Sequence, residues 1–146
     1  MASIKKLSST DLHLAKELIL FWETEDGRPI PTIPADQYLN KLLAKDSFHV
    51  FVAIENGIVV GGLTAYELIM FPKEEVEMFL YEIGVHENYR HQGIGTKLIE
   101  SLKELCIGKE IKVIFVGTST DNEAAKKLYE VTGGEMEVIP WFTYNL

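Results

Sequence analysis

The sequence Arg90-His91-Gln92-Gly93-Ile94-Gly95-Thr96 lies where the hydrophobic pattern of the chain changes from strand-like to helix-like. Before it, residues 78–85 are rich in aromatic and β-branched side chains, which predicts a strand. After it, apolar residues recur at helical spacing with charged residues on the other face, which predicts an amphipathic helix from Gly93 to Ile107. The quoted residues are therefore expected to form the turn between these two elements.

This turn has the features of an anion-binding site. The start of a helix presents backbone N–H groups without intrahelical partners, and the helix dipole adds positive potential. Glycine at positions 93 and 95 lets the main chain approach an anion closely. A dinucleotide fingerprint would need a third glycine where Leu98 stands, and a P-loop would need a different order of residues. The remaining R-x-x-G-x-G pattern predicts a phosphate or pyrophosphate ligand, with an ordinary strand-to-helix turn as the alternative.

A second strand-and-helix unit follows in the sequence. Ile111–Val116 is predicted to be a buried strand, and 122–132 a helix that Asn122 or Asp121 caps and Gly133 ends. A glycine-bearing turn followed by N-x-x-A-x-x-L-Y and a helix-stopping glycine resembles the GNAT superfamily of N-acetyltransferases. Within it, the chain looks most like the bacterial aminoglycoside 3-N-acetyltransferases. The stretches that look alike are residues 38–43, 59–66, 81–85 and 137–142.

The resemblance implies the fold and the cosubstrate. It predicts one domain over residues 1–146, with an α+β fold in which about four helices flank a mixed, mainly antiparallel sheet of about six to seven strands. It implies acetyl-CoA as the acetyl donor, held mainly by main-chain N–H groups. Ile83–Val85 would pair with the amide groups of the pantetheine arm, as an added strand does. The predicted cofactor-binding residues are Ile83, Gly84, Val85, Arg90, His91, Gln92, Gly93, Ile94, Gly95, Thr96 and Asn122.

Two residues are the predicted catalysts. Glu82 lies beside the pantetheine-binding stretch, and partial burial of its carboxylate would raise its pKa toward the range of a general base. The alternatives are a glutamate that only binds a cationic substrate or one that points to solvent. Tyr129 occupies the position of the superfamily's protonating tyrosine; without the motif it would be a core residue. Strand alternation predicts that Tyr81 and Glu82 face opposite sides of the sheet.

Composition narrows the class of protein. The chain has 146 residues, of which 47% are hydrophobic and 25% charged, as in soluble globular proteins. The sequence contains no apolar stretch that is long enough to predict a membrane span. The single cysteine favours the reducing cytoplasm. The net charge of −8 argues against a nucleic-acid partner and suits a small cationic amine. The four histidines show no metal-ligand spacing, so no metal is expected.

The first half of the chain contains the remaining predicted elements. A short strand at residues 4–7 precedes a helix that Ser9 or Thr10 caps and a second helix from about Asp36 to Lys45. The loop 27–34 between them contains three prolines, and two acidic, loop-like stretches are residues 22–27 and 72–77. Asn56-Gly57 predicts a hairpin between strands 48–55 and 58–71, with a bulge or close approach at Gly61-Gly62. The last strands are expected through Val138 and Phe142.

These observations leave three hypotheses about function. The leading one is a cytoplasmic N-acetyltransferase that acts on a small cationic amine by direct transfer; its specific form acetylates the 3-amino group of an aminoglycoside. The second is a non-catalytic acetyl-CoA sensor, which would need the anion-binding turn but not Glu82 and Tyr129. The third is acetylation of a protein lysine or N-terminus. The resemblance also suggests a homodimer through the C-terminal strands.

Overall fold

The computed structural model describes residues 1–27 and 29–146. The chain divides into two compact units, Met1–Val116 and Gly117–Leu146, and each is described by itself.

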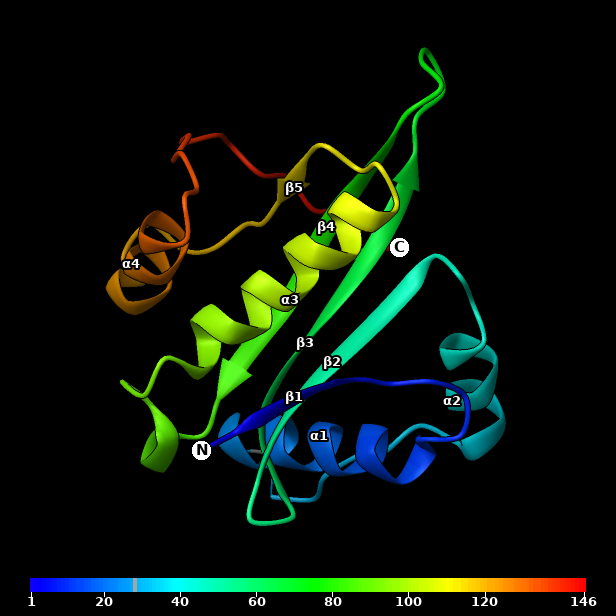
Figure 1. The fold of residues 1–146 in the computed structure, drawn as a ribbon, viewed down its shortest axis with the longest axis vertical. Coiled ribbons are helices and arrows are strands. Elements are labelled where there is room, and N and C mark those ends of the chain that lie inside the picture. Colours follow the sequence, from blue (N-terminus) through cyan, green and yellow to red (C-terminus); the bar gives the residue numbers. More distant parts are fainter. Residues whose placement is uncertain (28) are drawn as a thin grey trace. The chain divides into compact units, whose positions relative to one another are not determined.

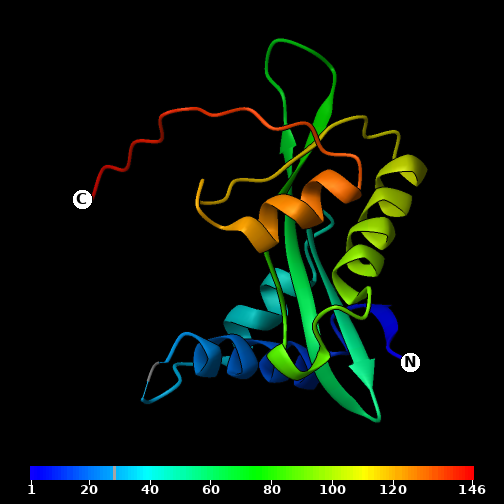
Figure 2. The same ribbon diagram turned by 90° about the vertical axis from the view of Figure 1, so that its left-hand side faces the viewer.

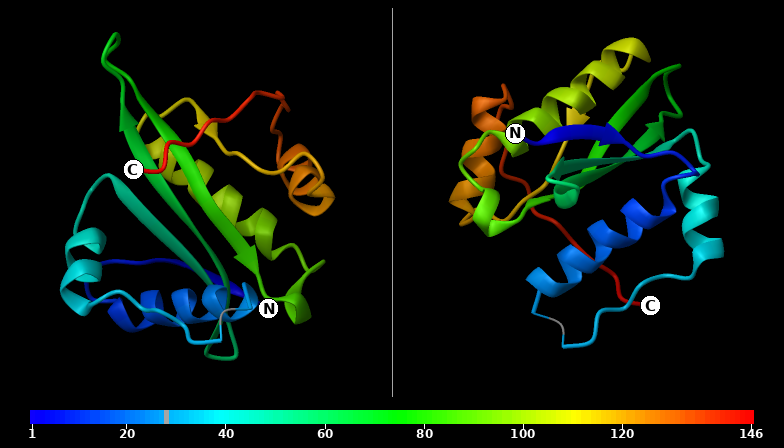
Figure 3. Two further views of the ribbon diagram at one scale, coloured as in Figure 1. Left: turned by 180° about the vertical axis from the view of Figure 1, so that it is seen from behind. Right: turned by 60° about the horizontal axis from the view of Figure 1, so that its bottom comes forward.

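A five-stranded sheet forms the centre of the first unit (Figure 1). The strands follow the chain order, and all neighbours are antiparallel except β4 and β5, which are parallel. Their bounds are β1 Ser3–Lys6, β2 Phe48–Glu55, β3 Ile58–Ile69, β4 Val76–Val85 and β5 Ile114–Phe115. The turn between β3 and β4 projects beyond the rest of this unit's sheet (Figure 3).

Helices cover both faces of this sheet (Figure 2). Helix α1, Leu12–Glu25, packs on β2 and β3, and α2, Asp36–Leu43, packs on β2. Helix α3, Ile94–Gly108, covers the opposite face and contacts β2, β3 and β4. A short 3₁₀ helix, η1 at Glu87–Tyr89, links β4 to the turn before α3. Fully buried side chains fill both layers, namely Leu18, Val52, Val60, Leu63, Met78, Leu80, Leu98 and Leu102.

The β2–β3 hairpin has the predicted turn and a bulge beside its glycine pair. Asn56 and Gly57 both have positive φ, 52° and 77°, as a two-residue hairpin turn requires. The register shifts between Ala53 and Ile54 of β2, which leaves Val60 as the extra residue next to Gly61. A Cβ on Gly62 would lie 2.7 Å from Leu18 Cδ2 and from the Phe51 carbonyl oxygen. The glycine therefore lets α1 approach the sheet closely.

The second unit contains helix α4, Glu123–Val131. Asn122 Oδ1 accepts a hydrogen bond from Ala125 N at 3.1 Å and caps its start. At its end, Gly133 N donates to Glu130 O and Gly134 N to Tyr129 O, with Gly133 at φ 97°. These two bonds form a Schellman motif. A Cβ at position 134 would lie 3.0 Å from Tyr129 O, so glycine suits this helix end.

Four expectations about the fold are wrong in detail. The predicted strands through Val138 and Phe142 do not form among the described residues, so the sheet has five strands rather than six or seven. The strand expected at Ile111–Val116 is confined to Ile114–Phe115. The acidic stretch 22–27 is largely the last turn of α1 rather than a loop, and Asp11, not Ser9 or Thr10, is the N-cap residue of that helix. The proline-containing stretch is irregular over residues 29–34, as expected; Arg28 lies outside the described residues.

Replacing Gly62 with alanine tests the close contact between α1 and the sheet. The new Cβ would overlap Leu18 and the backbone of Phe51, and overpacking of this kind costs roughly 1–3 kcal/mol of unfolding free energy. Urea denaturation measures this loss. Gly108→Ala is the matched control, because a Cβ at position 108 would have no atom within 4 Å and the φ of Gly108 is not positive. Equal stability of Gly62→Ala and the unchanged protein would contradict the packing argument.

Candidate functional site

The turn before α3 has the backbone geometry of an anion-binding loop. Gly93 is the N-cap residue, has φ 80°, and no side chain caps the helix there. The first hydrogen bond of the helix runs from Lys97 N to Gly93 O, at 3.0 Å. The N–H groups of residues 94–96 therefore precede the intrahelical ladder and point out of the helix start. His91 also has a positive φ, 61°, so two residues of the turn adopt the left-handed conformation.

Arg90 is engaged by its own neighbours. Its Nε donates a hydrogen bond to the Val85 carbonyl oxygen at 3.0 Å, and its Nη2 lies 3.7 Å from Glu25 Oε2. The side chain is 54% exposed, so the ion pair is weak, but the guanidinium still connects three segments. It joins the end of β4, the end of α1 and the turn before α3. The sequence predicted only a charge near the turn, and this connecting role was not foreseen.

The last residues of β4 offer a free edge. Strand β5 pairs only with Met78 and Phe79, so the edge of Leu80–Val85 has no strand partner among the described residues of the first unit. Gly84 in this segment packs against α1: a Cβ there would lie 2.8 Å from Trp22 Nε1. Ile83, Gly84 and Val85 can therefore present their outward backbone groups to an extended, amide-containing ligand.

A β-bulge places Tyr81 and Glu82 on the same face of the sheet. Thr64 pairs with Glu82 and Ala65 with Leu80, so Tyr81 is the extra residue. The Tyr81 ring packs edge-on against that of Tyr66 at 5.7 Å, and Tyr66 and Thr64 lie on one side of β3. The predicted opposition of Tyr81 and Glu82 is therefore wrong, because the bulge interrupts strand alternation.

Glu82 has a raised pKa. Partial burial of the carboxyl is the largest cause, and the negative charges of Asp26 and Glu23 add to it. The Thr64 hydroxyl opposes the rise; this contact is weaker than a full hydrogen bond, since Thr64 Oγ1 has no partner within hydrogen-bond geometry among the described residues. The residue itself remains exposed to solvent. Glu82 thus combines access to a ligand with a carboxylate that is more basic than an ordinary glutamate.

The surroundings of Glu82 include residues that the sequence did not single out individually. Asp26 follows the end of α1, and Trp22 lies one turn earlier with its Nε1 buried and unpartnered among the described residues. The pKa of Tyr66 is raised by burial and then by the charge of Glu82. The acidic composition of residues 22–27 was the sign of these groups in the sequence. Only the position of the end of α1 brings their side chains near Glu82.

The second unit contains the other predicted site residues, Asn122 and Tyr129. Asn122 uses its side-chain oxygen as a helix cap. Burial raises the pKa of the Tyr129 phenol. No group of three or more His, Cys, Asp or Glu side chains within residues 1–27 and 29–146 is arranged to hold a metal ion. No helix in the described part of the chain has the length and apolarity to span a membrane.

The fold and the site define a class of protein. A mainly antiparallel sheet has a free edge at the end of β4, and the turn into α3 presents N–H groups without intrahelical partners; these are the features that an extended, phosphate-bearing ligand requires. The sequence profile of the acetyltransferase (GNAT) family matches residues 14–133, and the chain belongs to that family. It has the GNAT α+β fold and is an acetyltransferase.

Known relatives include aminoglycoside acetyltransferases. An uncharacterized N-acetyltransferase of Bacillus subtilis, YycN, is 25% identical and is aligned over 87% of this chain and 82% of its own length. The aminoglycoside N(6′)-acetyltransferase type 1 of Klebsiella pneumoniae is 27% identical over 82% of this chain, which spans 64% of that enzyme. The crystal structure of an aminoglycoside acetyltransferase from an uncultured soil sample, in complex with sisomicin, matches with a TM-score of 0.93 and 31% identity, covering 99% of this chain and 96% of that one.

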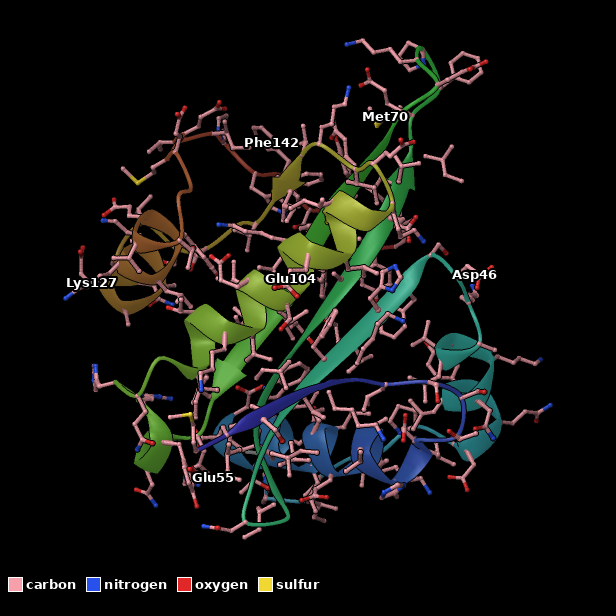
Figure 4. All side chains as sticks on the ribbon, in the orientation of Figure 1. Asp46, Glu55, Met70, Glu104, Lys127 and Phe142 are labelled. Carbon is pink, nitrogen blue, oxygen red and sulfur yellow. The ribbon has the colours of Figure 1, made fainter. Side chains whose placement is uncertain are left out.

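Asp26→Asn tests the electrostatics around Glu82. Removing the negative charge of Asp26 makes ionisation of Glu82 easier, so the pKa of Glu82 falls and its titration midpoint moves to lower pH. Carboxyl-selective NMR titration measures the midpoint. Asp46→Asn is the control, because Asp46 lies in the loop between α2 and β2 and is not among the groups that shift Glu82 (Figure 4). An unmoved or higher midpoint in Asp26→Asn would show that Asp26 does not act on Glu82.

Proposed function

We propose that the protein transfers the acetyl group of acetyl-CoA to a primary amine of a small cationic acceptor. The observation that carries the proposal is the raised pKa of Glu82, on an exposed residue beside the free edge of β4. A base at this point can take the proton of an amine, and the free edge can hold the donor next to it. The amine nitrogen bonds to the acetyl carbon, and the carbon–sulfur bond breaks.

The first unit provides the proposed donor-binding groups. The N–H groups of Ile94, Gly95 and Thr96 suit the pyrophosphate, and the outward backbone of Ile83, Gly84 and Val85 suits the pantetheine arm. Arg90 adds positive charge to the turn while it holds Val85 and Glu25. His91 and Gln92 shape the turn, and Asn122 is proposed from the resemblance alone.

Two side chains would manage the protons. Glu82 accepts the proton that the amine loses, directly or through water, in its ionised form. Tyr129, which the resemblance assigns as the acid, gives its proton to the departing sulfur and must therefore be protonated beforehand. The raised pKa of Glu82 suits its role, because it makes the carboxylate a stronger base.

The acceptor is proposed to carry more than one positive charge. Asp26 and Glu23 stand near Glu82, and the chain has a net charge of −8. The relatives named for aminoglycosides support an amino-sugar acceptor. Acetylation of a 3-amino group remains the specific form of the hypothesis. The relative from Klebsiella pneumoniae is named for acetylation at the 6′ position instead. A cytoplasmic location and a homodimer also stay predictions.

Replacing Glu82 with glutamine tests the proposed base. With acetyl-CoA and a panel of aminoglycosides, polyamines and lysine peptides, the unchanged protein should release CoA with small cationic amines. Glu82→Gln cannot accept the proton, so kcat should fall by about 10²-fold or more. Thiol release, followed with a chromogenic disulfide, measures the rate. Glu104→Gln, an exposed position on α3, is the control (Figure 4).

The outcomes separate the alternatives. A raised KM for the amine with unchanged kcat would make Glu82 a binding residue only. Acetyl-CoA binding without acetylation of any amine would favour the sensor, and activity confined to peptides would favour protein acetylation. Absence of acetyl-CoA binding in calorimetry would remove the proposal altogether.

Tyr129→Phe tests the proposed acid. The phenylalanine keeps the ring but cannot protonate the sulfur, so kcat should fall by about 10²-fold while the affinity for acetyl-CoA changes little. Steady-state kinetics and calorimetry measure the two quantities. Tyr144→Phe is the matched control, since Tyr144 is 87% exposed. An unchanged kcat in Tyr129→Phe would exclude the phenol from the reaction.

A further inference from the structure

Aromatic side chains line up across four neighbouring strands of the sheet. Phe48 of β2 is paired in register with Tyr66 of β3, Tyr66 with Phe79 of β4, and Phe79 with Phe115 of β5. The ring centroids of Phe48 and Tyr66 are 4.9 Å apart, and those of Phe79 and Phe115 are 4.8 Å apart in a stacked arrangement. Residues paired in register share a face of the sheet. The row therefore lies on the face that carries α1 and α2, opposite α3.

The row of aromatic side chains extends from the buried core at β2 to a solvent-exposed position at β5. Phe48 is buried at 8% exposure beneath the helices, and Tyr66 is partly buried against the same cluster. Phe115 is 37% exposed, and Tyr81, which the bulge adds to this face, is 56% exposed. The reason is that α1 and α2 pack mainly on β2 and β3, and the contact of α1 with β4 is at Gly84, through Trp22. We call Tyr66, Phe79, Tyr81 and Phe115 the aromatic platform.

Acidic groups adjoin the exposed part of the platform. Glu82 is next to Tyr81 on the same face, and the charges of Asp26 and Glu23 act on Glu82. Tyr81 packs edge-on against both Tyr66 and Phe79, with ring centroids 5.7 and 5.5 Å apart, so its ring adjoins two members of the row. An aromatic surface next to carboxylates complements a ligand that has an apolar face and ammonium groups.

We propose that the aromatic platform binds the ring of a cyclic polyamine, an amino sugar or an aminocyclitol, and so selects this acceptor over linear amines. The inference rests on the proposed function and names its acceptor class. The C–H face of a saturated ring packs on Tyr81 and the neighbouring rings while an ammonium group reaches Glu82. A flexible linear amine presents no such face and loses more conformational freedom when it binds.

The test compares two diamines that differ in shape. 2-Deoxystreptamine has a rigid six-membered ring, and 1,4-diaminobutane is linear; each carries two amino groups. NMR titration measures the dissociation constant of each diamine, in the presence of CoA, for the unchanged protein and for Tyr81→Ser. The ring diamine should bind the unchanged protein more tightly, and Tyr81→Ser should weaken its binding by about tenfold. Binding of the linear diamine should not change.

Two further variants separate recognition from folding. Tyr81→Phe retains the ring and should bind 2-deoxystreptamine almost as well as the unchanged protein. Phe71→Ser removes an aromatic side chain that is 102% exposed in the β3–β4 turn, away from the platform, and should have no effect. Thermal unfolding of all variants verifies that they are folded. If Tyr81→Ser does not fold, Phe115→Ser replaces it, with the same expected loss.

The possible results distinguish a failure of the platform proposal from a failure of the proposed acetyltransferase activity. Equal affinity for both diamines, no binding of either, or an equal loss of both in Tyr81→Ser would overturn the platform as a ring-binding surface. Selective binding of the ring diamine without any CoA release would support the platform and count against catalysis. Equally efficient acetylation of both diamines would support catalysis and refute the platform.

Discussion

The register shift in the β3–β4 ladder is the constraint on which the site depends. Because Tyr81 has no partner of its own on β3, Tyr81 and Glu82 both lie on the face that carries α1. This one extra residue brings the carboxyl of Glu82 near Thr64 and into the field of Asp26 and Glu23. Without the bulge, regular alternation would direct one of the two side chains toward α3, into the layer that Met78 and Leu80 fill.

A second feature of β4 complements the bulge. Pairing with β5 ends at Phe79, so the backbone beyond it is free on one edge, just where the strand approaches the turn before α3. Arg90 holds the end of this edge through the Val85 carbonyl and faces Glu25 at the end of α1. Glycine at position 84 allows α1 to pack closely there through Trp22. The candidate base Glu82 and the residues proposed to pair with the pantetheine arm, Ile83–Val85, are thus parts of one short segment of chain.

Much of this arrangement could be predicted from local patterns. The Asn56-Gly57 hairpin, the start of α3 and the extent of α4 follow from turn chemistry, amphipathic spacing and capping, which act over a few residues. The final strands at Val138 and Phe142 were predicted by the same reasoning and do not form. A strand needs a partner, and strand propensity by itself does not provide one.

The sequence alone predicted the glycine-bearing turn from a short motif and periodic apolar residues, and its resemblance to an acetyltransferase family predicted the candidate base at position 82. Only the tertiary structure decided which side of the sheet Glu82 faces, which acids raise its pKa, and that four aromatic residues distant in sequence form one row. The physical reason is that strand register and bulges arise from pairing between distant segments, and a shift of one residue reverses the face on which each following side chain lies.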